Sequence, residues 1–197
     1  LFLCDQHLSH MKSEKINNKH NLLLEVCLAA KYEGESLKGY HDKYRAKYRD
    51  TNSQLCTVLA RSFADIGDII RGKDLFIGYN QKDRKEKAKL QENLRKIFKE
   101  IYNKLGDTEA KERYKDEDDN EENYYKLRED WWKLNRETVW KALTCEVGSG
   151  TYFHATCGDE EKKSTLASNK CRCDGKKPGT NADQVPTYFD YVPQYLR

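Results

Sequence analysis

The stretch GDIIRGKD, residues 67–74, contains most of a phosphate-binding loop. Gly67, Gly72 and Lys73 stand where that motif needs them to cradle the phosphates of a nucleotide. The next position should carry a hydroxyl for Mg²⁺, but Asp74 is there and its carboxylate would repel phosphate. A strand should precede the loop, whereas the preceding apolar residues recur at steps of three and four and predict a helix that Gly72 ends. These features argue against a nucleotide site.

The cysteines are the next candidates for chemistry. The chain has seven, which favours an oxidising compartment and disulfides. Zinc is the alternative, because Cys145, Cys157, Cys171 and Cys173 lie close in sequence. However, the tight pair is C-x-C and no histidine pair has zinc-finger spacing, so disulfides are favoured over metal. Because seven is odd, at least one cysteine, such as Cys4, is expected to be free or to pair outside the chain.

The titratable residues do not converge on a catalytic site. The five histidines are scattered over polar segments. His41 and Asp42 are neighbours that diverge by about a hundred degrees on a helix. His154 near Cys157 could be a ligand or a nucleophile–base pair, but a disulfide-rich loop is the favoured interpretation. We predict no enzyme activity, no metal and no cofactor.

A basic helix is the best candidate for a contact surface. Residues 82–99 carry eight Lys or Arg and three Asp or Glu, a local charge of +5. Cations at helical spacing can meet the sulfates or sialic acids of a polyanionic glycan over a range of geometries. An ordinary solvated face is the competing interpretation, and sequence alone favours it. The candidate glycan-binding residues are Lys82, Arg84, Lys85, Lys87, Lys89, Arg95, Lys96 and Lys99.

Composition indicates what elements must position these residues. Of 197 residues 35% are charged and 11% aromatic, with three prolines, which favours long helices with narrow apolar stripes and wide solvated faces. A net charge of +3 is too small to argue for nucleic acid as a partner. No apolar run approaches the length of a membrane span. Both ends stop in mid-pattern, so the chain is expected to be a piece of a larger protein.

Helical periodicity of apolar residues predicts helices over most of the chain. A first helix is expected over 17–33 and closed by Gly34. Leu37, Tyr40, Tyr44 and Tyr48 then share one face, and such an aromatic stripe is more often core than a ligand site. Further helices are predicted up to Gly72, over 80–106 and over 124–143, where the adjacent Trp131 and Trp132 must face different partners.

The remaining segments are predicted to be irregular. Residues 107–122 have nine acids and three bases, a charge of −6, and are typical of an exposed loop. Residues 145–186 lack periodicity and are interpreted as a loop stapled by disulfides. The stretch VPTYFDYVPQYLR begins a new element. The predicted fold is all-α, an antiparallel helical bundle with long disulfide-pinned loops.

Several long strings resemble a known family. LARSFADIGDIIRGKDLF (59–76), LREDWWKLNRETVWKALTC (127–145) and VPTYFDYVPQYLR (185–197) are similar to blocks of the Duffy-binding-like domains. EVCLAAKYEG (25–34) is similar to a further block. They resemble the α class of the variant Plasmodium falciparum erythrocyte membrane protein family. Segments 107–123 and 147–184 match no block, as expected of hypervariable regions.

The resemblance implies a Duffy-binding-like fold in three subdomains. Residues 1–16 would end the first subdomain, 17–184 would form the helical-bundle second, and 185–197 would begin the third. It also implies an extracellular position, as part of a membrane protein on the infected erythrocyte surface, and no catalytic activity. Gly67, Gly72 and Lys73 would then belong to a packed helix and its exit.

The resemblance further implies a host-receptor-binding adhesion module. In this family α-class domains are associated with cytoadherence and rosetting through heparan-sulfate-like or blood-group glycans and complement receptor. Host antibodies and neighbouring domains of the same adhesin would be further partners. The alternative is a structural or antigenic spacer module, with binding done by neighbouring domains. The glycan-binding candidates listed above rest on charge and are not carried over from a family motif.

Disulfide pairing is expected within this framework. Cys27 and Cys56 lie on two predicted helices expected to be neighbours, so we expect a bond between them that contributes about 3–4 kcal/mol. The four cysteines of the loop from residue 145 are expected to pair among themselves, in one of three connectivities.

Overall fold

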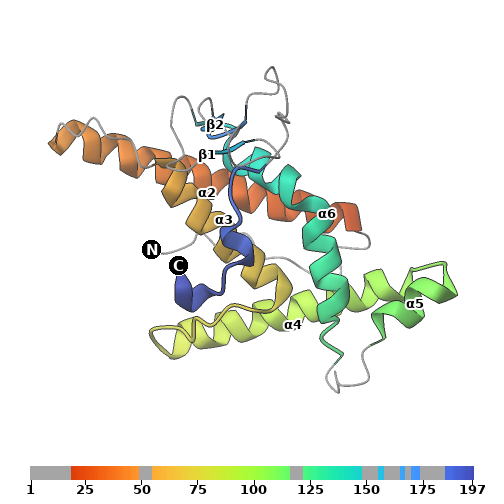
Figure 1. The fold of residues 1–197 in the computed structure, drawn as a ribbon. Coiled ribbons are helices and arrows are strands. Elements are labelled where there is room, and N and C mark those ends of the chain that lie inside the picture. The colour runs from red at the N-terminus through yellow and green to blue at the C-terminus, as the bar shows by residue number, and fades with distance from the viewer. Residues whose placement is uncertain are drawn as a thin grey trace. The chain divides into compact units, whose positions relative to one another are not determined.

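The computed structural model describes residues 19–48, 55–115, 122–147, 155–157, 165–166, 170–173 and 185–197. Helices dominate these residues, and one short antiparallel strand pair accompanies them (Figure 1). The predicted all-α fold is confirmed. The elements are α2 (Lys19–Tyr48), α3 (Leu55–Arg71), α4 (Gln81–Asn103), α5 (Thr108–Tyr114), α6 (Tyr125–Leu143), β1 (Ala155–Cys157), β2 (Thr165–Leu166) and the 3₁₀ turns η2 (Phe189–Tyr191) and η3 (Gln194–Leu196).

The chain divides into two compact units. The first unit comprises residues 1–29 and 67–135, and the second comprises residues 30–66 and 136–197. The boundaries fall inside α2, α3 and α6, so each of these helices contributes to both units. The division into subdomains made from the sequence stays a prediction.

Helix α4 supplies much of the core of the first unit. Asn80 caps its start, because the Asn80 side chain accepts a hydrogen bond of 2.9 Å from the N–H of Asp83. Five side chains with little or no exposure form its apolar face, Leu90, Leu94, Ile97, Phe98 and Ile101, whereas Leu105, which was also expected on this face, lies beyond the end of the helix and is only half-buried. Spacings of three and four place them on one side of the helix and leave the charged residues on the others.

The two adjacent tryptophans of α6 pack against different partners in the first unit. Trp131 meets Phe98 of α4 edge to face, with ring centroids 6.2 Å apart. Trp132 covers Gly67, where a Cβ would lie 2.8 Å from the indole ring. Neighbouring helix positions point about a hundred degrees apart, which confirms the prediction that they face different partners.

The exit of α3 confirms the helix interpretation of residues 67–74. Gly72 has φ +75°, the left-handed conformation that follows many helix C-termini. Its N–H donates to the carbonyl of Ile69 at 3.2 Å, and the N–H of Lys73 donates to that of Asp68 at 2.8 Å. Both bonds belong to the Schellman motif. The glycine and lysine therefore close a helix and do not begin one.

The predicted helix end at Gly34 is wrong. Helix α2 continues through Gly34 to Tyr48. A Cβ on Gly34 would overlap the carbonyl oxygen of Leu143 and lie 2.9 Å from the carbonyl carbon of that residue, within the second unit. The glycine is needed there because the backbone of α2 meets that of α6, and sequence spacing cannot distinguish such a contact from a helix stop.

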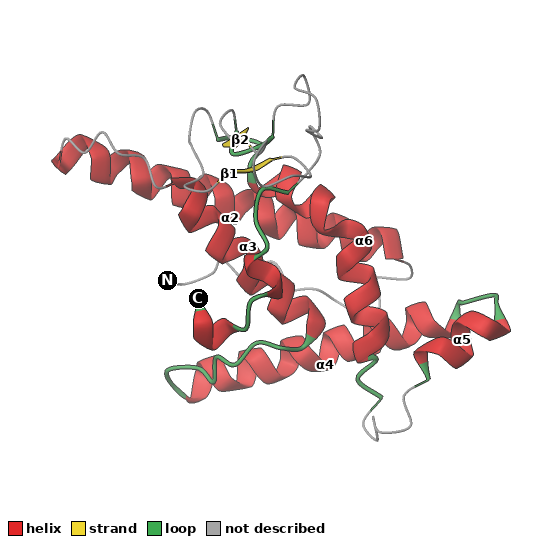
Figure 2. Ribbon diagram, viewed as in Figure 1, coloured by secondary structure: helices red, strands yellow, loops and turns green. Residues whose placement is uncertain are grey.

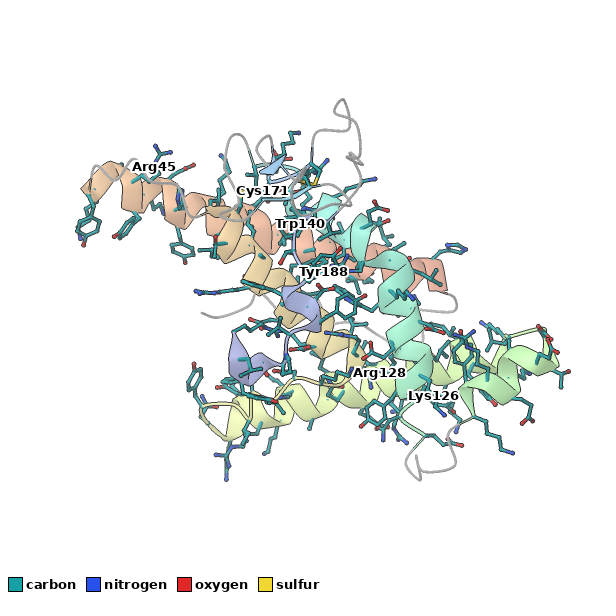
Figure 3. All side chains as sticks on the ribbon, in the orientation of Figure 1. Arg45, Lys126, Arg128, Trp140, Cys171 and Tyr188 are labelled. Carbon is teal, nitrogen blue, oxygen red and sulfur yellow. A yellow bond between two sulfur atoms is a disulfide. The ribbon has the colours of Figure 1, made fainter. Side chains whose placement is uncertain are left out.

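The aromatic stripe of α2 also differs from its prediction. Tyr40, Tyr44 and Tyr48 are 69%, 54% and 58% exposed, so they are not core residues. Tyr44 and Tyr48 contact each other, with ring centroids 4.7 Å apart. Arg45 marks this end of α2 in Figure 3. Periodicity identifies side chains that share a face, but it does not show that another element covers that face.

Two disulfides cross-link the second unit. Cys56 of α3 bonds to Cys171, 115 residues later, and Cys157 bonds to Cys173. The predicted Cys27–Cys56 bond is therefore wrong. The four loop cysteines also do not all pair among themselves, since Cys145, like Cys27, is bonded to no cysteine of the described residues.

Hydrogen bonds to α6 place Cys171 beside Cys56. Trp140 donates from its indole nitrogen to the carbonyl of Cys171 at 3.1 Å, and both residues are labelled in Figure 3. Arg172 donates to the carbonyl of Lys141 at 2.7 Å, one of the last carbonyls of α6. The loop is thus held along α6, a long-range arrangement that cysteine spacing alone does not indicate.

Part of the acidic stretch is helical. Asp107 caps α5 by accepting a hydrogen bond of 3.0 Å from the N–H of Glu109, so the prediction of a loop over 107–122 is wrong at Thr108–Tyr114. Arg113 and Tyr114 both contact Asp130 of α6, at 2.9 and 3.0 Å. Residues 116–121 lie outside the described part of the chain.

The last residues pack within the second unit through an ion pair between the buried Asp190 and the half-buried Arg136. Arg136 of α6 binds Asp190 with two hydrogen bonds of 2.8 Å and the carbonyl of Thr187 with a third. The rings of Phe63, Tyr188 and Tyr191 lie within 5.2–5.8 Å of its guanidinium carbon. Burial lowers the pKa of Arg136, but the hydrogen bonds to Asp190 raise it and the net direction is upward.

Some predictions fall on residues that are not described, namely Cys4, His7, His10 and His154. Within the described residues, no helix is long and apolar enough to cross a lipid bilayer.

Candidate functional site

Acidic side chains accompany most of the predicted basic residues of α4. Ion pairs join five of the eight cations to carboxylates. These pairs are Lys82–Glu86 at 3.8 Å, Lys87–Asp74 at 2.9 Å, Arg95–Glu92 at 2.9 Å, Lys96–Glu92 at 3.5 Å and Lys99–Glu122 at 2.5 Å. Arg84, Lys85 and Lys89 form no ion pair with any described residue. The surface is therefore less positive than the count of +5 suggests.

Three of the lysines form a row on the side of α4 that faces away from its buried residues. Lys85, Lys89 and Lys96 follow each other at steps of four and seven, which keeps them on one face of a helix. All three are exposed. We call them the outer lysine row. Their exposure on one face lets them approach an extended polyanion together, although Lys96 also contacts Glu92 at 3.5 Å.

The paired cations differ in how firmly they are held. The hydrogen bond from Arg95, in spite of partial desolvation, lowers the pKa of Glu92. The hydrogen bond that Lys99 donates to Glu122 raises the pKa of Lys99. Such exposed pairs are weak because water and salt screen them, so an incoming anion can compete for the cations. Lys87 is different, because its partner Asp74 is only 11% exposed.

A groove lies on another face of α4. It has a volume of about 490 Å³ and is formed by the loop after α3, by α4 and by the segment that leads into α6. Figure 2 shows that loop running beside α4. We call it the inner groove. The residues that line it are Gly72, Asp74, Lys87, Ala88, Gln91, Glu92, Arg95, Asn123, Tyr125 and Arg128.

Arg128, which is labelled in Figure 3, lines the inner groove. It is 2% exposed and donates to the carbonyl of Ile70 at 2.6 Å and to that of Ile69 at 3.3 Å. It also donates to the side-chain oxygen of Gln91 at 2.9 Å, and the amide of Gln91 donates to Ile69 at 3.2 Å. A cation here is favourable because the carbonyls are the negative end of the α3 dipole.

Lys87 and Asp74 form one wall of the groove. The Lys87 ammonium contacts the Asp74 carboxylate at 2.9 Å and the Asp74 carbonyl at 3.1 Å. The carboxylate also accepts a hydrogen bond of 3.0 Å from the N–H of Phe76. Asp74 therefore orients the loop, which is a different role from the phosphate repulsion considered for the sequence.

Sequence reasoning found Lys87 and Arg95 but missed the rest of the groove. Arg128 carries the one signal that could have revealed it, since a cation sits between Leu127 and Trp131 on a face that is otherwise apolar. Such a residue is expected to have buried partners. Among the described residues, no three His, Cys, Asp or Glu side chains gather as a metal site would require.

The whole chain resembles known proteins. The family described as the Duffy binding domain matches residues 1–197. The chain belongs to this family. No curated protein sequence matches it. The Duffy-binding-like fold expected from the resemblance is thereby confirmed, together with the recognition of the family.

Solved structures of the family show the same fold. The NTS-DBL1(alpha-1) domain of Plasmodium falciparum PfEMP1 from the varO strain is 40% identical, with a TM-score of 0.71 over 98% of this chain and 39% of that chain. The PfEMP1 IT4var13 DBLbeta domain bound to ICAM-1 is 29% identical, with a TM-score of 0.62 over 98% of this chain and 40% of that one. This Duffy-binding domain thus spans about two fifths of either relative.

A more distant relative extends the likeness of fold. Plasmodium falciparum Erythrocyte Binding Antigen 140 is 21% identical, with a TM-score of 0.51 over 98% of this chain and 22% of that chain. At this identity the comparison supports the fold alone.

Proposed function

We propose that this Duffy-binding domain is an extracellular adhesion module that binds a host receptor on erythrocytes. A related DBLbeta domain, 29% identical, is described as bound to ICAM-1. The 40% identity to a DBL1(alpha-1) domain of PfEMP1 supports a place in the same class of surface adhesin. On this proposal the chain would lie on the infected erythrocyte and mediate cytoadherence or rosetting.

The proposed receptor contact is the outer lysine row. Lys85, Lys89 and Lys96 are exposed on one face of α4, and this is the observation that carries the proposal. An extended sulfated or sialylated glycan, such as a heparan-sulfate-like chain, can contact several lysines at once. Each contact is tolerant of geometry, because a lysine ammonium is a compact charge on a flexible stem.

Charge reversal tests the proposal. We expect the triple variant Lys85→Glu, Lys89→Glu, Lys96→Glu to lose retention on immobilised heparin and binding to uninfected erythrocytes. The matched control reverses Lys43, Lys47 and Lys133, exposed lysines of α2 and α6, and so changes the net charge equally. Both proteins should carry intact disulfides. Equal heparin retention by both variants would show that the effect is general charge and would remove the outer lysine row from the site.

A spacer function is the second candidate. The ion pairs that neutralise much of α4 favour it, because they leave fewer cations for a ligand. If the folded domain fails to bind erythrocytes at any ionic strength, the adhesion proposal fails for this segment. Binding that weakens steeply with salt would argue against the spacer function.

A further inference from the structure

The loop between α3 and α4 exposes a group of large apolar and aromatic side chains. Leu75, Phe76, Ile77 and Tyr79 are 60%, 42%, 74% and 68% exposed. We call these four residues the apolar loop. None of them lines the inner groove, and all belong to the first unit. Apolar side chains gathered in this way on a surface indicate a contact with another molecule.

Hydrogen bonds hold the apolar loop in one conformation beside α4 (Figure 2). The N–H of Phe76 donates to the Asp74 carboxylate at 3.0 Å. The N–H of Tyr79 donates to the Asp83 carboxylate at 3.1 Å. Gly78 has φ +94°, and a Cβ there would lie 3.0 Å from the backbone of α4. Because the backbone is ordered before any partner binds, displaying the apolar side chains costs little loop entropy.

Two exposed cations stand at the start of α4, next to the apolar loop. A Cβ on Gly78 would lie 3.2 Å from the Arg84 side chain, so Arg84 adjoins the loop directly. Lys82 meets Glu86 only at 3.8 Å, with both side chains more than half exposed. The helix dipole favours acidic residues at a helix start, so neither cation stabilises α4 through the dipole. Both are placed to meet anions beside the apolar loop.

An anionic lipid bilayer suits this combination of side chains better than a protein does. Apolar and aromatic side chains enter the boundary between headgroups and acyl chains, while Lys and Arg stay with the anionic headgroups. A second copy of the chain is disfavoured, because its own cations would oppose those of the first. A different protein would need a pocket that matches the exposed side chains, whereas a bilayer is soft and needs no such match.

We propose that the apolar loop, together with Lys82 and Arg84, binds the surface of an anionic phospholipid bilayer. Leu75 and Ile77 enter the boundary of the acyl chains, and the Tyr79 ring lies at the level of the headgroups. The contact is peripheral and reversible, since only a few side chains enter the lipid. It uses none of the three lysines of the outer lysine row and goes beyond the receptor contact proposed above.

Vesicle co-sedimentation of the full chain, with its disulfides intact, measures the binding. The probes are vesicles of phosphatidylcholine mixed with phosphatidylserine, and vesicles of phosphatidylcholine alone. We expect binding to the mixed vesicles that weakens with salt, and much weaker binding to phosphatidylcholine alone. The variant Lys82→Gln, Arg84→Gln should bind the mixed vesicles about fivefold more weakly for each charge removed. The control Lys43→Gln, Lys133→Gln removes the same charge from exposed positions of α2 and α6 and should keep most of the parent's affinity.

A tryptophan in the apolar loop shows whether the loop enters the lipid. Ile77 is the most exposed residue of the loop, so Ile77→Trp should fold normally, and brominated phosphatidylcholine in the mixed vesicles should quench its emission. Leu134→Trp is the control, because Leu134 is 81% exposed on α6 and outside the loop. Its emission should be quenched no more than that of the parent. Thermal unfolding checks that both variants fold.

Loss of the apolar side chains completes the test. The variant Leu75→Ser, Ile77→Ser should bind the mixed vesicles at least about tenfold more weakly than the parent. The proposal is overturned if the parent does not bind the mixed vesicles, if this variant binds them equally well, or if Ile77→Trp is quenched no more than Leu134→Trp. A dimer in analytical ultracentrifugation that the same variant abolishes would assign the loop to a second copy and also overturn the proposal.

Discussion

Adding one methyl group to α2 should have opposite effects on the free energy of unfolding at two glycines that look alike in the sequence. Gly34 and Gly39 both lie inside α2. A Cβ on Gly39 would meet nothing within 4 Å, whereas one on Gly34 would overlap the main chain of Leu143. Gly39→Ala should therefore raise the free energy of unfolding by about 1 kcal/mol, the difference between alanine and glycine in a helix interior.

At Gly34 the clash with the main chain of Leu143 outweighs the gain in helix propensity. The new Cβ would lie 2.9 Å from a carbonyl carbon, whereas ordinary contacts are 3.4–4 Å, and a backbone cannot rotate away as a side chain can. Overpacking costs about 1–3 kcal/mol, and a rigid neighbour favours the upper end. We expect Gly34→Ala to be about 2 kcal/mol less stable than the parent, so the two variants should differ by about 3 kcal/mol.

Equilibrium denaturation with guanidinium, followed by the helical circular dichroism signal, measures this difference. The disulfides must stay oxidised so that all variants share one unfolded state. If Gly34→Ala is as stable as Gly39→Ala, α2 and α6 do not meet at this point and the reasoning fails. It also fails if Leu143→Ala restores Gly34→Ala, because the overlap involves the main chain and not the leucine side chain.

Other perturbations test the cross-links and buried groups. Replacing Cys56 and Cys171 together by alanine should lower the free energy of unfolding by about 4–5 kcal/mol, since the bond closes a loop of 115 residues; equilibrium denaturation measures it, and unchanged stability would contradict the pairing. Asp190→Ala should cost about 3–5 kcal/mol by leaving the Arg136 cation buried, while adding Arg136→Leu should recover part of that loss in a double-mutant cycle. Burial raises the pKa of Cys27 to about 11, so its thiol should react slowly with iodoacetamide at neutral pH and faster as pH approaches that value. Because the pKa of the Cys27 thiol is raised in the folded state, the thiol also contributes stability that is present below its ordinary pKa near 9 and lost as pH rises toward about 11. If the free energy of unfolding depends on pH in the same way in Cys27→Ala and in the parent, this contribution is refuted.

The sequence predicted elements whose signal is local. Apolar residues at steps of three and four predicted α4, and Gly72 predicted the end of α3. Predictions from the sequence were wrong where contacts between distant residues determine the structure. Gly34 looked like a helix end because its backbone contact with α6 does not affect the sequence around it. Cys171 reaches Cys56 because hydrogen bonds hold the loop along α6.

The candidate site shows the same limit. Counting charges over residues 82–99 found every cation of α4, but it could not tell which carboxylate each one meets. Asp74 and Glu122 come from other segments, so the ion pairs with Lys87 and Lys99 are visible only in the fold. The inner groove was missed for that reason, since its walls come from three separate stretches of the chain.

Pairing, more than charge, then decides what each face of α4 can bind. Lys85 and Lys89 have no carboxylate partner among the described residues, so they lose no existing contact when an anion binds, whereas Lys96 must first release Glu92. A lysine held by a nearly buried aspartate, as Lys87 is by Asp74, gains little from an anion but can still donate to a hydroxyl. One helix can therefore present faces whose cations differ in how readily they accept an anion, and the salt dependence of binding would reveal which face a ligand uses.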